Sequence, residues 1–278
     1  MRVSIFGVRG SVPVTDSECL GAGGNTSCVA IAHDGRAPSR VLDAGTGIRT
    51  VSAALGGAPF AGAIVLSHLH WDHVQGLPFF ASADHPDAEV SLLVPGQGEP
   101  AAGVLARIMS PPFFPVVPGE LRGRWSVEGY AEGEHRLGGF SVLAREVPHG
   151  AGRTMGLRVD DGRACVAYVP DHGPTGLGPG DDGLGVLHPA ALALATGADL
   201  LIHDAQYTEQ ELPDRLAFGH SAAGYGVGLA ERCGVPRVLL FHHDPCRTDA
   251  ALEAMAAGLR RDGGPAVGIA REGEVIDL

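Results

Sequence analysis

The densest group of potentially reactive side chains is a histidine-rich segment that directly follows an apolar run. Residues 67–73 read Ser-His-Leu-His-Trp-Asp-His, so three imidazoles and one carboxylate lie within six residues. The preceding run, Ala63–Leu66, predicts a buried strand, and His68 and His70 project to the same side if the chain stays extended beyond it. The aspartate and the last histidine follow where the chain must turn, and they then face the first pair across roughly 3.5–4 Å, the spacing of two-metal sites. The segment therefore predicts a site for two divalent metal ions rather than a solvated loop.

The remaining ligands of such a site must come from elsewhere in the chain. His149, Asp171 and His242 each follow an apolar run directly, and this shared pattern would place all three along one rim of a sheet sandwich. Two neighbours leave alternatives open. His243 competes with His242 as a ligand, and His172 is either part of a substrate pocket or an ordinary loop histidine. The histidines outside any motif, which we expect at the surface, are His33, His85, His135 and His188.

The composition excludes several classes of function. The 278-residue chain has 20 basic and 32 acidic residues, a formal net charge of −12, and no lysine. Schiff-base and P-loop chemistry that depends on lysine is therefore excluded. Because basic side chains dominate phosphate-backbone affinity, long polyanions are poor candidate substrates, and nucleic acid is not expected as a partner. A phosphate would have to be held by metals and arginine, with Arg9, Arg49 and Arg153 closest in sequence to the motifs.

The cysteines and the first residues indicate an ordinary intracellular protein. The five cysteines are scattered without a C-x-x-C pair, which argues against a disulfide framework and a cysteine-rich zinc site. The N-terminal residues lack a secretory-signal pattern, and no apolar run approaches the roughly 18 residues of a membrane span. We expect a cytoplasmic protein with no membrane partner. The oligomeric state stays open, with a homodimer as one option.

Short apolar runs bounded by Gly, Pro and Asp predict buried strands that outnumber the helices. The predicted strands are residues 3–6, 28–32, 40–42, 63–66, 90–94, 141–144, 157–159, 165–169, 200–202, 238–241 and 266–269. The predicted helices are residues 103–109, 189–196, 222–233 and 249–259. Interleaved strands and helices favour a layered α/β (α+β) architecture. No segment reads as an interdomain linker, so we expect residues 1–278 to form a single domain of two halves.

These motifs together resemble the metallo-β-lactamase superfamily, in particular the branch of the tRNA 3′-processing nucleases and their small phosphodiesterase relatives. The most specific match is His68–Pro78, which has the branch's H-x-H-x-D-H-x-x-G-L-P pattern. The other matching segments, in order, are Gly7–Gly10, Gly24–Ser27, Asp43–Gly47, His149 with Thr154–Leu157, Asp171, Leu201–Ala205, Gly219–Ser221 and Leu240–His242. The resemblance implies an αββα sandwich of two mixed sheets flanked by helices, with the metals at one edge.

The resemblance also implies which residues hold the metals. The expected ligands are His68, His70 and His149 for the first ion, Asp72, His73 and His242 for the second, and Asp171 as the bridge. The family's spacing from the strand favours His242 over His243. Imidazole and carboxylate ligands suit Zn²⁺, with Mn²⁺ or iron as alternatives because no thiolate is included.

The catalytic roles follow from the same resemblance. Two metals lower the pKa of a shared water and so supply a bridging hydroxide as nucleophile. Asp72 would orient that water. His220 would act as a general acid or as a donor to the developing oxyanion, with Asp204 orienting it.

One departure from the family pattern points to a small anionic substrate. The tRNA-processing enzymes carry a long arm between the residues that correspond to His149 and Asp171, and here that interval is short. A cyclic nucleotide or cyclic sugar phosphate is therefore the expected substrate, and a lactone, thioester or other carbonyl metabolite is the alternative for the same site. The Pro- and Phe-rich segment Met109–Val116, with Phe79 and Phe80, either forms an apolar lid over the metals or simply fills core.

Overall fold

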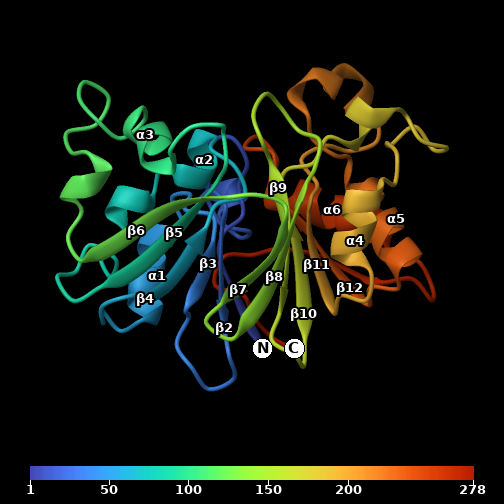
Figure 1. Cartoon of the computed structure of the whole chain (residues 1–278). Helices are drawn as coiled ribbons and strands as arrows, with labels where there is room; N and C mark the ends of the chain where they lie inside the picture. The colour runs from blue at the N-terminus through green and yellow to red at the C-terminus, as the bar shows by residue number, and fades with distance from the viewer.

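The protein consists of two seven-stranded mixed sheets that pack face to face (Figure 1). The computed structural model describes all 278 residues. In order across the first sheet, the strands are β14 (Val275–Asp277), β1 (Arg2–Gly7), β2 (Cys28–Ala32), β3 (Arg40–Leu42), β4 (Ala61–Val65), β5 (Glu89–Pro95) and β6 (Arg124–Tyr130). Across the second sheet they are β13 (Ala266–Ile269), β12 (Arg237–Phe241), β11 (Leu200–Asp204), β10 (Cys165–Val169), β9 (Met155–Asp160), β8 (Phe140–Glu146) and β7 (Gly133–Leu137).

Six α-helices cover the outer faces of the sheets (Figure 1). They are α1 (Ile48–Ala54), α2 (Trp71–Val74), α3 (Ala101–Ala106), α4 (Pro189–Ala195), α5 (Ala223–Cys233) and α6 (Asp249–Leu259). The first three lie with the first sheet and the last three with the second, so the expected αββα sandwich is confirmed. No helix is both long and apolar enough to cross a membrane.

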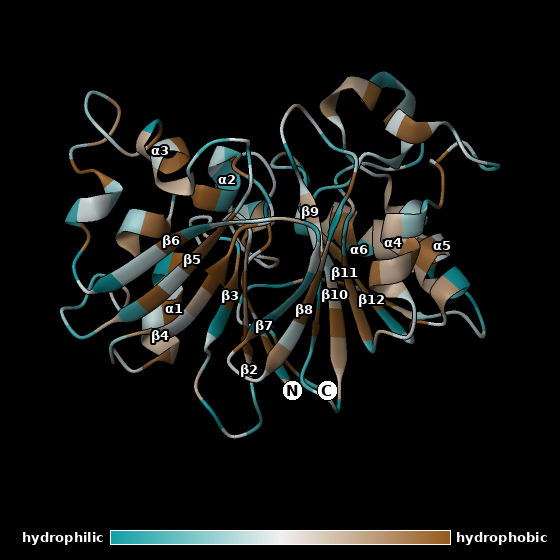
Figure 2. Cartoon of the chain, viewed as in Figure 1, coloured by the Kyte–Doolittle hydropathy of each residue, from teal (hydrophilic) through white to brown (hydrophobic).

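The central strands are buried on both faces, because each sheet packs against the other sheet on one face and against helices on the other. In β10, Val166 and Tyr168 enter the cluster between the sheets, whereas Cys165, Ala167 and Val169 enter the cluster under the helices. Successive side chains on a strand point to opposite faces, so a doubly covered strand needs a continuous apolar sequence. Figure 2 shows this as hydrophobic strands enclosed by polar loops.

Parallel pairing brings the chemically important strand ends to one rim. β3, β4 and β5 run parallel in the first sheet, and β10, β11 and β12 run parallel in the second. Parallel strands present their carboxyl ends at a common edge, which is where open α/β sheets bind ligands. The two chain termini meet at the opposite end of the molecule, where the Met1 ammonium donates to the Leu278 carbonyl at 3.0 Å.

Every strand predicted from an apolar run is present, but three strands and two helices were missed. β6 and β7 are edge strands with alternating exposed polar residues, and β14 is short and half exposed, so none has a continuous apolar sequence. Helices α1 and α2 have seven and four residues, too few for a periodic pattern to stand out. The single-domain organisation stays a prediction.

The core between the sheets yields a stability prediction. Leu157 is fully buried there, and we expect Leu157→Ala to lower the free energy of unfolding by about 2–5 kcal/mol, because it removes apolar contacts and leaves a cavity. Leu177→Ala is the control: this side chain is 55% exposed and its loss should change stability by less than about 0.5 kcal/mol. Urea unfolding measures both. Equal effects would contradict the assigned core.

Candidate metal centre

All seven predicted ligands lie along the rim formed by the strand ends. His68 and His70 come from the loop after β4, and Asp72 and His73 from α2 at the end of that loop. The other three come from the second sheet: His149 from the β8–β9 loop, Asp171 after β10 and His242 after β12. The rim therefore joins residues from both sheets, as the sequence pattern predicted.

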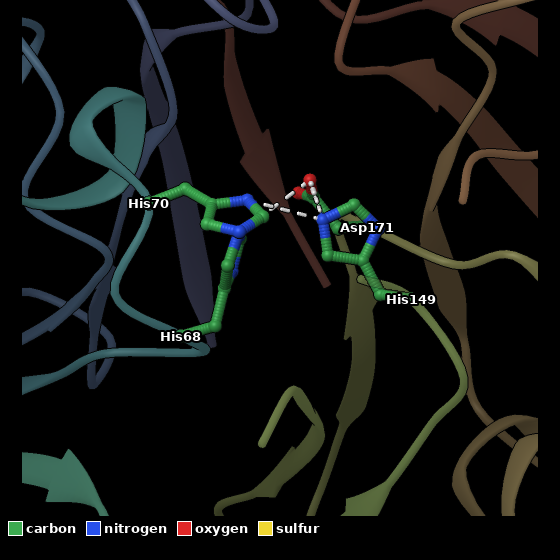
Figure 3. A group of neighbouring side chains, drawn as sticks. All are labelled: His68, His70, His149 and Asp171. Atoms are coloured by element: carbon green, nitrogen blue, oxygen red, sulfur yellow. Dashed lines mark hydrogen bonds and ion pairs between the residues drawn. The ribbon is translucent and has the colours of Figure 1, made fainter. Parts of the chain in front are cut away.

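The first group is formed by His68, His70, His149 and Asp171 (Figure 3). The two loop histidines approach from the first sheet, and His149 and Asp171 face them from the second. His149 Nε2 lies 3.2 Å from His70 Nδ1 and 3.4 Å from Asp171 Oδ2. One ligand atom of each residue lies within 4.8 Å of the others, a span that one metal ion can occupy.

The second group is formed by Asp72, His73 and His242, with ligand atoms equally close together. His242 Nε2 lies 3.1 Å from Asp72 Oδ2 and 3.3 Å from His73 Nε2. Asp171 lies between the groups: its Oδ1 is 3.0 Å from His73 Nε2, and its Oδ2 is 3.4 Å from His242 Nε2. The arrangement suits a carboxylate shared by two ions.

The unpaired atoms of the cluster fit a metal-binding role. His68 Nε2 is buried without a hydrogen-bond partner, and Asp171 Oδ1 has none apart from its contact with His73 Nε2, an arrangement that is unfavourable unless a cation or donor satisfies these atoms. Burial also lowers the pKa values of His68, His70 and His149, which keeps these imidazoles neutral and able to bind a metal. We therefore find that the donor set fits divalent cations.

The outward nitrogens of the imidazoles are held by oxygen acceptors. His73 Nδ1 donates to Asp43 Oδ2 at 2.8 Å, His149 Nδ1 to the Gly219 carbonyl at 2.6 Å, and His242 Nδ1 to Gln206 Oε1 at 3.0 Å. Such contacts fix the tautomer that leaves Nε2 free and set the orientation of the ring. Sequence reasoning assigned no role to Asp43 or Gln206, and the only signal for Asp43 was its place in the Asp43–Gly47 turn.

Backbone strain is concentrated around this cluster. Only three non-glycine residues have positive φ, namely Ser11, Asp43 and His242, and each touches the centre. Ser11 N–H donates to Asp72 Oδ2 at 2.6 Å, and the other two are described above. Strained residues of this kind persist where the surrounding structure over-determines them, which is common at functional sites.

His220 and Asp204 form a pair beside the two groups. His220 Nδ1 donates to Asp204 Oδ2 at 2.8 Å, and Asp204, fully buried, also accepts the backbone N–H groups of His172 and Gln206. Burial opposes a charge on His220, but the carboxylates of Asp204, Asp171 and Asp72 together outweigh it, with Asp204 contributing most, and raise the pKa of His220 above its usual value. His220 lines the site cavity, so its ring is available to a ligand.

His172 is a loop residue, but it does not line the site cavity. Its side chain is fully buried and points away from the cavity into a row of three imidazoles. His203 Nδ1 donates to the Asp204 carbonyl, so His203 Nε2 accepts from His172 Nδ1 at 3.0 Å, and His172 Nε2 then accepts from His188 at 2.8 Å. The expectation that His188 is a surface residue is wrong, because it closes this row and is 6% exposed.

Two further expectations about polar residues are settled by burial. His242, and not His243, joins the cluster, since His243 Nε2 faces the Ala270 carbonyl at 3.0 Å. Arg9 cannot hold a phosphate, because its buried guanidinium already donates to four backbone carbonyls. Arg153 remains partly exposed and pairs with Glu146 at 3.0 Å.

A cavity of about 400 Å³ opens onto the cluster and is lined by Ser11, Leu69, His70, Trp71, Asp72, Asp171 and His220. A larger groove of about 1110 Å³ runs along β4, β5 and β6 but contains none of these residues. The cavity that contacts the predicted ligands is therefore the smaller of the two, and it opens to solvent at the rim.

Comparison with known proteins decides the family. Residues 41–243 match the family model described as the β-lactamase superfamily domain. The chain belongs to the metallo-β-lactamase superfamily. The predicted superfamily membership and the prediction of a metal-dependent hydrolase are thereby confirmed.

Relatives of the chain include proteins named as a nuclease and a diphosphatase. A ribonuclease Z from Natronomonas pharaonis is 26% identical, with 87% of this chain and 86% of the relative covered. The metallo-β-lactamase fold protein YhfI from Bacillus subtilis superposes with a TM-score of 0.71 at 17% identity, covering 99% of each chain. A diphosphatase from the PhnP family gives a TM-score of 0.71 at 18% identity, covering 100% of this chain and 97% of that one.

These relatives bear on the expected partners. One of them is a ribonuclease, so the expectation that nucleic acid is not a partner is not supported. The homodimer and the cytoplasmic location stay predictions.

The contact between Asp43 and His73 yields a prediction about metal affinity. Asp43→Asn removes the carboxylate charge that orients the His73 ring, and we expect metal affinity to fall about 10–100-fold. Competition with a chromophoric chelator measures this. Asp87→Asn, at a carboxylate that is 82% exposed, is the matched control and should bind metal as the parent does. Unchanged affinity in a folded Asp43→Asn protein would contradict the assignment.

Proposed function

We propose that this hydrolase is a phosphodiesterase that uses two divalent metal ions and acts on a small phosphodiester such as a cyclic nucleotide or cyclic sugar phosphate. The observation that carries the proposal is the His220–Asp204 pair, held 2.8 Å apart beside two ligand groups with Asp171 between them. A positioned proton donor next to paired cations suits a reaction that expels an alkoxide from phosphorus. The relatives named as a ribonuclease and a diphosphatase act on phosphate esters or anhydrides, which supports the same chemistry.

The chain would hold the two ions, Zn²⁺ by preference with Mn²⁺ or iron as alternatives, through the two groups of the rim. The first ion would take His68, His70 and His149, the second would take Asp72, His73 and His242, and Asp171 would contact both. Bound there, divalent ions would make water a nucleophile near neutral pH and would neutralise charge on the phosphoryl oxygens.

The chain's own residues would position the reacting groups. The Asp72 carboxylate, anchored by the Ser11 N–H, is oriented to accept a hydrogen bond from the attacking water. Burial opposes the charge on Asp72, but His73 and His242 outweigh it and hold the pKa of this carboxyl well below its usual value, so it stays an acceptor. His220 would donate from its free nitrogen to the leaving oxygen or to the developing oxyanion, while Asp204 fixes the ring.

The size of the substrate is inferred from the loops around the rim. β9 ends at Asp160 and β10 begins at Cys165, so a tight turn joins them and no arm extends there to hold a long RNA. The net charge of −12 further disfavours a polyanion, whereas one small anion can bind at the metals.

A substrate panel tests the proposal. We expect metal-loaded protein to hydrolyse bis-p-nitrophenyl phosphate and cyclic phosphodiesters, with activity lost on chelation and restored by Zn²⁺ or Mn²⁺. A lactone, a thioester and a short RNA with a 3′ extension are assayed in parallel. Turnover of the carbonyl substrates alone would support the alternative chemistry, and a higher kcat/KM on the RNA would refute the small-substrate proposal.

The His220–Asp204 pair yields a prediction about rate and pH. His220→Ala should lower kcat about 10²–10⁴-fold, as expected for a lost general acid. A general acid works only while protonated, so activity should fall as the pH rises through the pKa of His220. Asp204→Asn removes the charge that raises this pKa, so the alkaline limb of the kcat profile should move to lower pH. A lower kcat with an unmoved alkaline limb would show that Asp204 only supports the fold.

A further inference from the structure

An apolar groove lies beside the metal cavity and is separate from the ligands. It has a volume of about 440 Å³, and nine of its twelve lining residues are hydrophobic. Trp71 lines both the groove and the metal cavity, so the two spaces adjoin at this residue. Trp71 stands between His70 and Asp72 in the sequence, and its position is therefore fixed by the metal-binding segment.

The groove exposes aromatic rings that the core does not use. Trp71 is 73% exposed, Phe113 is 80% exposed and Phe79 is 56% exposed. Phe79 meets Phe114 edge to face at 6.0 Å, which joins α2 and the following turn to the Pro- and Phe-rich segment. Phe80 was expected to be a partner of this segment, but it packs against Phe60 in the core instead. The other aromatics thus form an open wall rather than a plug of core or a closed lid.

The charges around the groove select a neutral occupant. Its one charged lining residue, Arg107, is paired with Glu99 at 3.0 Å, so no free charge is offered to a ligand. Exposed indole and phenyl faces bind flat rings by stacking. For a nucleobase on an aromatic side chain, stacking contributes about 1–3 kcal/mol of binding free energy. Pockets of a few hundred Å³ hold one small group rather than a polymer.

We propose that this groove is a subsite for a flat, uncharged aromatic group, a nucleobase, carried by the phosphodiester whose phosphate lies at the metals. This rests on the proposed function and deepens it, because the groove distinguishes between the two small substrate classes: it favours a cyclic nucleotide over a cyclic sugar phosphate that lacks a base. Trp71 and Phe113 are the specificity-determining residues. They touch the base and not the reacting atoms.

A matched pair of substrates tests the subsite in the metal-loaded protein. Adenosine 2′,3′-cyclic phosphate and methyl riboside 2,3-cyclic phosphate share the scissile group and differ in the base, and ³¹P NMR follows both. We expect kcat/KM to be about 5–150-fold higher for the nucleotide, mainly because its KM is lower. This factor is the stacking free energy given above, converted at 1.4 kcal/mol per tenfold. In Phe113→Ala and Trp71→Ala the ratio should fall toward one.

Leu177→Ala is the matched control, because Leu177 is an apolar side chain that is 55% exposed and lines neither the groove nor the metal cavity. It should retain the selectivity. A ratio near one in the parent protein, or a ratio unchanged in Phe113→Ala, would overturn the subsite.

A binding measurement separates failure of the subsite from failure of the proposed function. Isothermal titration calorimetry compares adenosine 5′-monophosphate, phenyl phosphate and ribose 5-phosphate on the metal-loaded protein, with no turnover required. Tighter binding of both aromatic ligands, lost in Phe113→Ala, supports the groove even if no phosphodiester is hydrolysed. Preference for the nucleotide alone narrows the subsite to nucleobases. Equal affinity for all three ligands would refute the subsite whatever the enzyme hydrolyses.

Discussion

The buried carboxylate of Asp43 joins the two sheets directly beneath the metal cluster, and the geometry of the site depends on it. It accepts Ser67 N–H and Oγ–H and His73 Nδ1–H from the first sheet's loop, and the Tyr168 hydroxyl, at 2.7 Å, from β10 of the second sheet. A buried carboxylate is tolerated only when its acceptor sites are filled in this way. The same four contacts fix the loop after β4 against β10, so the ligands of both sheets face each other at a set distance.

Asp204 has a corresponding place on the other side of the centre. Its carboxylate orients His220 and also accepts the backbone N–H of His172, the residue after Asp171. The buried row of His203, His172 and His188 packs behind this peptide and is satisfied by a one-way chain of hydrogen bonds. Both carboxylates therefore act on the centre by holding neighbouring groups in place. A polar network replaces apolar packing at the positions where the ring orientation of the imidazoles must be set.

The rim offers two different surfaces to a ligand. The polar cavity presents imidazoles and carboxylates, and two divalent ions held there would place about four positive charges on an otherwise acidic protein. The adjacent groove presents uncharged aromatic faces that meet the cavity at Trp71. Charge and apolar contact thus lie side by side, an arrangement that suits a small molecule with a phosphate at one end and a flat ring at the other. Two such ions would offset the net charge of −12 locally and so allow an anion to bind.

Local sequence patterns were enough to predict the central strands and the chemical character of the rim. Doubly covered strands such as β10 need continuous apolar residues, and the metal segment His68–His73 is compact enough to be recognised locally. Tertiary contacts were needed to show that His243 faces away from the cluster, that Arg9 and His172 are buried outside the cavity, and which groups Asp43 contacts. The same is true of the edge strands β6 and β7, whose polar alternation depends on the exposure of that edge. The physical reason is shared: burial and hydrogen-bond partners come from segments distant in the chain, and local sequence patterns carry no record of them.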